Sequence, residues 1–129
     1  MPPNAKSIIL LIVEDDEVIL RALYIAFHNE NYTIATATNG EEALKIAERI
    51  KPDVILLDLL LPKMNGFDFL KNMKANPDLT ATPVIVLSNL GDRDDMEKAK
   101  MLGASDYFVK ADTDLSVLVK KIQKMPVAA

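Results

Sequence analysis

Four carboxylates of this sequence come directly after short apolar runs, at positions where they could act together. Glu14, Asp15 and Asp16 follow the first run, and Asp58 follows a later one. Carboxylates that share one crevice raise one another's pKa values unless a cation lies among them. A hard divalent ion with oxygen ligands, such as Mg²⁺, is the natural neutraliser. Asp16 is the exception, because it directly precedes a helical pattern and is better interpreted as a helix N-cap.

Ser88 and Lys110 hold the same kind of position, each directly after a later apolar run. Taken alone, a serine at a strand end indicates no function. A lysine there more often packs its aliphatic part on the protein and keeps its charge in water than takes part in a site. Taken with the acids, they complete a set: a nucleophile at Asp58, an acidic pair for a cation, a hydroxyl donor and an ammonium group. Carboxylates can accept phosphoryl groups, and phosphoryl transfer mainly requires an aligned nucleophile and cations around the phosphoryl oxygens. The set therefore indicates phosphoryl transfer to Asp58.

Apolar runs of strand length must position these side chains. Residues 8–13, 54–57, 84–87 and 107–109 are continuously apolar, which is typical of strands buried on both faces. Residues 32–38 alternate and indicate an edge strand. Apolar residues recur between the strands at helical spacing, on five separate faces. These faces are Leu20, Leu23 and Phe27; Ala43, Ala47 and Ile50; Phe67, Leu70 and Met73; Met96, Ala99 and Leu102; and Leu115, Leu118 and Ile122.

A strand followed by a helix, repeated five times, predicts a doubly wound α/β fold. Its parallel sheet would have right-handed crossovers and helices on both faces, giving a three-layer (βα)5 sandwich. Ligands of such sheets bind outside the carboxyl ends of the strands. The polar residues above lie at those ends.

The composition is that of one globular domain. The chain has 129 residues, half of them hydrophobic, a net charge of −4 and no cysteine. The acidic balance argues against a general nucleic-acid binder, and the missing cysteines exclude disulfides and thiolate metal sites. The first apolar run is too short for a membrane helix or a signal peptide, so a cytoplasmic protein is expected. We expect one domain over residues 7–124, an N-terminal tail at 1–6, and at 125–129 a C-terminal tail or the remnant of a linker.

Five stretches, taken in order, resemble the receiver domain of two-component response regulators. The resemblance runs from about Ile8 to Ile122 and implies a flavodoxin-like sheet of strand order 2-1-3-4-5. The matching stretches are residues 12–17 (IVEDDE), 53–58 (DVILLD), 62–66 (PKMNG), 83–88 (PVIVLS) and 103–110 (GASDYFVK).

The resemblance also implies roles in a metal site. Asp58 would be the phosphoacceptor and a metal ligand. Asp15 would bind Mg²⁺ directly, Glu14 would act largely through water, and the backbone carbonyl of Leu60 would be a further ligand. Mn²⁺ would be an alternative to Mg²⁺, and no organic cofactor is implied.

The remaining roles concern the phosphoryl group and the switch. Ser88 and Lys110 would contact phosphoryl oxygens, and Tyr107 would turn inward as Ser88 moves toward the phosphate. The donor would be a sensor histidine kinase or a phosphotransfer protein. The fourth helix, fifth strand and fifth helix would carry the signal to a downstream effector. The resemblance thus implies a signalling switch that catalyses its own modification, not an enzyme, as a monomer or a phosphorylation-dependent homodimer.

The sequence departs from the family pattern beside the site. Ala111 stands where the family usually has a proline after a cis peptide. Because a cis non-proline bond costs about 3–4 kcal/mol, we predict a trans bond or a shifted loop. Asn89 replaces a smaller residue, and the apolar Leu60 and Leu90 should hinder an attacking water, so we expect a long-lived phosphoryl state. The single histidine, His28, is interpreted as a helix-end residue.

Three other interpretations compete with an active receiver. A flavodoxin-type FMN binder would need a first loop rich in glycines and hydroxyls, whereas residues 14–17 are all acidic. A haloacid-dehalogenase-like phosphatase would need a second carboxylate where Leu60 stands. A degenerate receiver, acting as a phosphorylation-independent interaction scaffold, is the strongest rival because Ala111 and Asn89 are atypical. Because every residue needed for phosphorylation is present, an active receiver is favoured over a scaffold. The chain would be either a natural single-domain regulator or a piece of a longer protein cut near Met125.

Overall fold

The structure, a computed structural model, describes residues 7–28 and 31–125. Five parallel strands form one sheet in the order β2-β1-β3-β4-β5. The strands are β1 (Ile8–Val13), β2 (Tyr32–Ala37), β3 (Val54–Leu57), β4 (Val84–Ser88) and β5 (Asp106–Val109). The helices are α1 (Glu17–His28), α2 (Gly40–Ile50), α3 (Gly66–Ala75), α4 (Arg93–Met101) and α5 (Leu115–Gln123), with a 3₁₀ turn η1 at Lys110–Asp112. The predicted fold class, a doubly wound flavodoxin-like sheet of order 2-1-3-4-5, is confirmed. The predicted tails, 1–6 and most of 125–129, lie outside the described residues.

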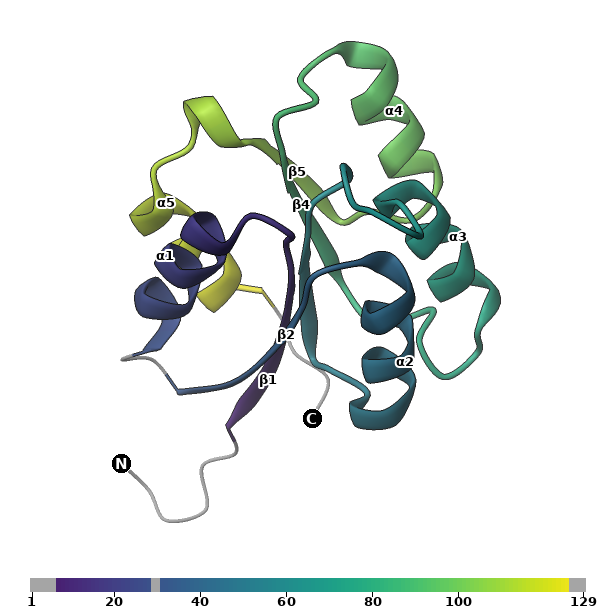
Figure 1. Ribbon diagram of the computed structural model, residues 1–129, viewed down its shortest axis with the longest axis horizontal. Coiled ribbons are helices and arrows are strands. Elements are labelled where there is room, and N and C mark those ends of the chain that lie inside the picture. The colour runs from purple at the N-terminus through teal and green to yellow at the C-terminus, as the bar shows by residue number, and fades with distance from the viewer. Residues whose placement is uncertain (1–6, 29–30, 126–129) are drawn as a thin grey trace.

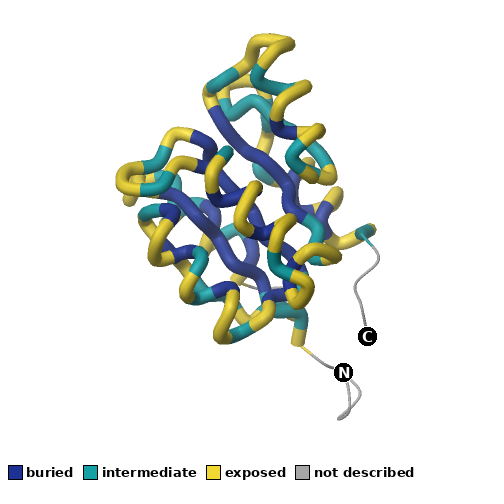
Figure 2. The backbone as a smooth tube through the Cα atoms, turned by 90° about the vertical axis from the view of Figure 1, so that its right-hand side faces the viewer, coloured by how far each residue is buried: buried dark blue, intermediate teal, exposed yellow. Residues whose placement is uncertain are grey.

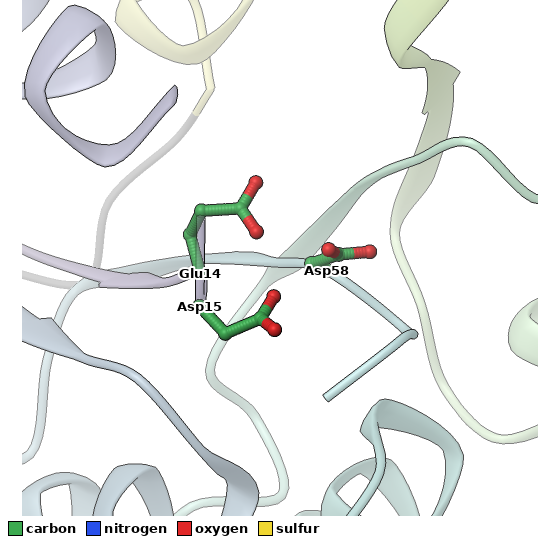
Figure 3. A group of neighbouring side chains, drawn as sticks. All are labelled: Glu14, Asp15 and Asp58. Atoms are coloured by element: carbon green, nitrogen blue, oxygen red, sulfur yellow. The ribbon is translucent and has the colours of Figure 1, made fainter. Parts of the chain in front are cut away.

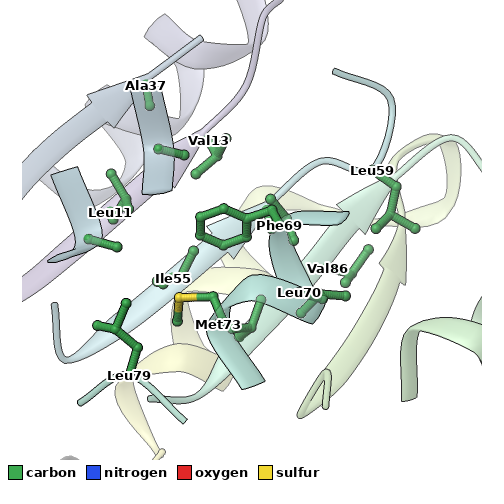
Figure 4. Close-up of a cluster of buried hydrophobic side chains, with 14 of the residues drawn as sticks. Leu11, Val13, Ala37, Ile55, Leu59, Phe69, Leu70, Met73, Leu79 and Val86 are labelled. Carbon is green, nitrogen blue, oxygen red and sulfur yellow. The ribbon is translucent and has the colours of Figure 1, made fainter. Parts of the chain in front are cut away.

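Helices cover both faces of the sheet. Helices α1 and α5 lie on one face and α2, α3 and α4 on the other (Figure 1). Successive residues of a strand point to opposite faces, so each buried strand contributes to two cores. In β1, Leu10 and Ile12 pack with the α1–α5 cluster, whereas Leu11 and Val13 pack with the α2–α4 cluster. Figure 2 shows the buried strands running through the centre, and Figure 4 shows the α2–α4 cluster around Phe69.

The burial of β5 differs from the prediction. Residues 107–109 were expected to be buried on both faces, but every residue of β5 is only half-buried. The reason is its place in the sheet, because β5 pairs with β4 alone and forms the second edge. The alternating strand β2 is the other edge, as predicted.

Local capping explains where the first helix begins. The N–H groups of Val18 and Ile19 donate to Asp16 Oδ1 at 2.9 and 3.3 Å. The interpretation of Asp16 as an N-cap is therefore confirmed. At the other end of α1, His28 is the last helical residue and its ring stacks on Tyr24, with centroids 5.8 Å apart.

Two further expectations concern the backbone. There is no cis peptide within residues 7–28 and 31–125, so the Lys110–Ala111 bond is trans, as predicted, and it lies in η1. None of the helices in the described ranges is both long and apolar enough to cross a membrane.

Candidate functional site

The β-sheet register brings the first residues after β1 and β3 side by side. Val13 pairs with Leu57, the last residues of the two strands. The ladder then continues by one more bond, because the N–H of Asp58 donates to the Val13 carbonyl at 3.0 Å. On the other side of β1, the N–H of Glu14 donates to the Ala37 carbonyl at 3.0 Å. The backbones of Glu14 and Asp58 are therefore held by the sheet.

Three carboxylates meet at this edge. Oxygen atoms of Glu14, Asp15 and Asp58 all lie within 4.8 Å of one another (Figure 3). Glu14 is 2% exposed and Asp58 5% exposed, whereas Asp15 is open to solvent. The predicted acidic crevice is therefore present, and Asp16 is outside it. Two buried carboxylates this close need a positive charge.

Lys110 supplies a positive charge to the crevice. Its Nζ lies 2.9 Å from Asp58 Oδ2 and 2.5 Å from Glu14 Oε1. Burial lowers the pKa of Lys110, but the hydrogen bonds to Glu14 and Asp58 outweigh burial and raise it. The ammonium group therefore stays charged. The pairing with Asp58 was expected from the sequence, but the pairing with Glu14 was not, because β5 and β1 are not neighbours in the sheet.

The protonation of Glu14 is affected by its burial and by the nearby carboxylate of Asp58. The pKa of Glu14 is raised from its ordinary value of 4.5 to about 7, because burial and the neighbouring Asp58 raise it by more than the hydrogen bond and charge of Lys110 lower it. Glu14 thus titrates close to neutral pH in the protein without a metal. A cation in the crevice would favour its ionised form.

The donor set fits a hard divalent cation. All three side chains offer carboxylate oxygens, which Mg²⁺ and Mn²⁺ prefer. Asp15 faces solvent, so a cation held there would keep water ligands, as Mg²⁺ usually does. Leu60 lies beside the set, because its N–H donates to Asp58 Oδ1 at 3.2 Å. The role of its carbonyl stays a prediction.

Ser88 and Tyr107 are connected through one backbone residue. Ser88 is fully buried at the end of β4, and its Oγ accepts a hydrogen bond from the N–H of Leu90 at 3.3 Å. The Tyr107 hydroxyl donates to the Leu90 carbonyl. Burial, followed by the carboxylates of Asp95 and Asp92, raises the pKa of Tyr107 to about 12, so the hydroxyl keeps its proton. The link through Leu90 was missed, since backbone groups leave no sequence signal.

An acidic crevice with a strand-end aspartate and a lysine, on a 2-1-3-4-5 sheet, defines the class of receiver domains. The model of the response regulator receiver domain family matches residues 10–123. The chain therefore belongs to this family, whose members are signalling switches rather than classical enzymes.

Similar proteins include several regulators. Response regulator PleD of Caulobacter vibrioides is 34% identical over 111 residues, which cover 86% of this chain and 24% of PleD. Transcriptional regulatory protein KdpE of Mycobacterium tuberculosis is 43% identical over 102 residues, which cover 79% of this chain and 44% of KdpE. The chain thus spans less than half the length of these relatives.

Similar solved structures include response regulators that this chain matches over nearly the whole length of both chains. The phosphorylated cyanobacterial phytochrome response regulator RcpA has a TM-score of 0.88 at 28% identity, covering 97% of this chain and 100% of that chain. The Mn²⁺-bound form of response regulator Rcp1 has a TM-score of 0.83 at 27% identity, covering 94% and 99%.

Proposed function

We propose that Asp58 accepts a phosphoryl group from the phosphohistidine of a sensor histidine kinase or a phosphotransfer protein. The observation that carries the proposal is the setting of Asp58. It is buried at the end of a central strand, 2.9 Å from the Lys110 ammonium and beside two further carboxylates. A carboxylate oxygen of Asp58 forms a bond to phosphorus while the phosphorus–nitrogen bond of the donor breaks. The leaving imidazole then takes up a proton.

The surrounding residues would bind and orient the phosphoryl group. Lys110 and Ser88 would contact its oxygens by an ammonium and a hydroxyl donor. Asp15, Asp58 and the Leu60 carbonyl would hold Mg²⁺, or Mn²⁺ in its place, and Glu14 would act mainly through a water ligand. The bound ion supplies positive charge to the phosphoryl oxygens during transfer. The Mn²⁺-bound Rcp1 structure supports a divalent ion in this class of site.

The signal would leave through the α4–β5–α5 face. Phosphorylation places new negative charge beside Ser88, whose Oγ is joined to Tyr107 through Leu90. A shift of Ser88 toward the phosphoryl group would change both bonds and turn Tyr107, which is a local charge change biasing a two-state element. A downstream effector in the cytoplasm, or a second phosphorylated copy of the chain, would read the altered face.

The phosphoryl state should be long-lived. Leu60 is 53% exposed next to Asp58, and Leu90 is half-buried in the loop after Ser88. Neither apolar side chain can orient a water for attack on the aspartyl phosphate. A dephosphorylation half-life of seconds in the isolated protein would contradict this expectation.

The direct test uses acetyl phosphate with Mg²⁺ and intact-mass measurement. We expect the mass of one phosphoryl group on the wild-type chain and none on Asp58→Asn. Asp15→Asn keeps the acceptor but should slow modification strongly, because it removes a cation ligand. Modification that persists in Asp58→Asn would place the acceptor elsewhere. A folded wild-type chain that is never modified would favour the alternative, a scaffold that acts without phosphorylation.

A further inference from the structure

The loop between β3 and α3 includes Asp58 and Leu60, which both belong to the proposed site. The two ends of this loop are in close backbone contact. The N–H of Gly66 donates to the Leu59 carbonyl at 2.9 Å, which joins the two ends of the loop. A Cβ atom on Gly66 would lie 2.6 Å from Leu59 Cα and 2.7 Å from the Asp58 carbonyl oxygen. No side chain fits there, so this end of the loop is held by backbone packing.

A second contact holds the loop from the side, and it comes from α2. Gly40, the first residue of α2, is buried against the backbone of Met64. A Cβ atom on Gly40 would overlap the Met64 carbonyl oxygen and lie 2.6 Å from its carbonyl carbon. Since both of these are backbone atoms, no change of rotamer could relieve the overlap. Any side chain at position 40 must displace either the loop or the start of α2.

The start of α2 is itself well anchored, so the loop is the part expected to move. The Asn39 side chain caps α2 by accepting from the N–H of Glu42 at 2.8 Å. Buried Ala43 and Ala47 pack α2 into the core below. Residues 60–65 of the loop, by contrast, are mostly exposed between these two backbone contacts, and Lys63 has a left-handed φ of 65°. A conformation of that kind persists only where its surroundings enforce it.

We propose that Gly40 is a positioning residue for the cation and phosphoryl site. Its missing side chain lets the Met64 backbone rest on α2, and this contact sets where Leu60 lies relative to Asp58. The Leu60 N–H already holds one Asp58 oxygen at 3.2 Å, so a displaced loop would disturb both the carbonyl ligand and the acceptor. The inference rests on the proposed function, yet Gly40 is not one of the residues proposed to hold the ion or the phosphoryl group.

The test is a Mg²⁺ titration of Gly40→Ala, followed by amide chemical shifts. If the start of α2 alone moves to relieve the overlap with Met64, the variant should lose stability but keep its Mg²⁺ affinity. A positioning role should weaken Mg²⁺ binding about tenfold or more, the range typical of residues that orient metal ligands. The matched control is Gly91→Ala, where a Cβ would be 3.6 Å from Val109 and in ordinary contact.

The outcomes separate this inference from the proposed function. If wild-type protein binds no Mg²⁺ and takes no phosphoryl group, the proposed function fails. If wild type and Gly40→Ala bind Mg²⁺ equally, the positioning role alone is overturned. Should Gly40→Ala not fold, the wild-type titration still decides: the Gly40 amide must shift together with those of Leu60 and Met64. A Gly40 resonance that stays fixed while the other two shift would overturn the inference.

Discussion

At the scale of single residues, the main feature of the site is that it buries charged side chains. Glu14 and Asp58 are almost fully buried, and Lys110 is shared between them. Without a bound metal ion, the Lys110 ammonium group therefore supplies the positive charge that balances these two carboxylates. The sequence could predict that these residue types gather at one edge of the sheet. It could not predict which carboxylate the lysine contacts more closely, because that depends on how far its side chain reaches across the crevice.

Replacement of Lys110 by methionine tests the countercharge. Because two buried carboxylates would lose their partner, we expect the free energy of unfolding of the metal-free protein to fall by about 3 kcal/mol. Urea denaturation at about pH 8, where Glu14 is ionised, measures the change. The control is Lys121→Met, since Lys121 is half-exposed and 3.5 Å from Asp106, and should change stability by less than about 1 kcal/mol. Equal effects of the two substitutions would contradict this account.

Glu14 should make the stability of the metal-free protein depend on pH. Its pKa is about 7 in the folded state and near 4.5 in the unfolded chain, so the folded state binds more protons between these values. Stability from this group is present below the lower value and lost as the pH rises through the upper one. We expect a loss on the order of 3 kcal/mol for wild type, measured relative to Glu14→Gln by urea denaturation. Saturating Mg²⁺ should reduce the loss, and parallel pH curves for the two proteins would refute the assignment.

At the scale of elements, sequence pattern predicted the strands and helices but not the exposure of the last strand. The run at residues 107–109 looks as buried as the run at 54–57, yet β5 is an edge strand and β3 is central. Strand order is a property of the assembled sheet, so residue type within one run does not encode it. Conversely, the Asp16 cap was predicted because it depends only on its own local chain. The close packing of Gly40 was missed because the pair Asn39-Gly40 looks in the sequence like an ordinary break between a strand and a helix.

Gly103 ends the turn after α4 and is required there by its backbone. Its φ is 108°, and no atom beyond its two chain neighbours lies within 4 Å of where a Cβ would be. Gly103→Ala should therefore cost about 2 kcal/mol through backbone strain alone, with Mg²⁺ affinity unchanged. Gly91→Ala is the matched control, and it should be neutral or slightly stabilising because it restricts the unfolded chain. Thermal or urea unfolding measures both, and a neutral Gly103→Ala would show that the turn adapts without strain.

At the scale of the whole molecule, the two faces of the sheet are joined by the strands themselves. In β3, Val54 and Leu56 belong to the α1–α5 cluster, and Ile55 and Leu57 belong to the α2–α4 cluster. One cluster cannot come apart without exposing backbone and side chains that hold the other. The acidic crevice lies at the end of the same strands, so its geometry depends on both cores.

This shared sheet predicts that both clusters unfold in a single transition. Phe27 on one side and Phe69 on the other are each fully buried. Phe27→Ala and Phe69→Ala should each lower the free energy of unfolding by about 3–5 kcal/mol, whereas Ile25→Ala, at an exposed site, should have little effect. Far-ultraviolet circular dichroism and tyrosine fluorescence should give coincident unfolding curves for every variant, as expected for one cooperative unit. If Phe69→Ala instead separated the two signals, the α2–α4 side would be an independent unit. The loop that Gly40 holds could then loosen without loss of the sheet.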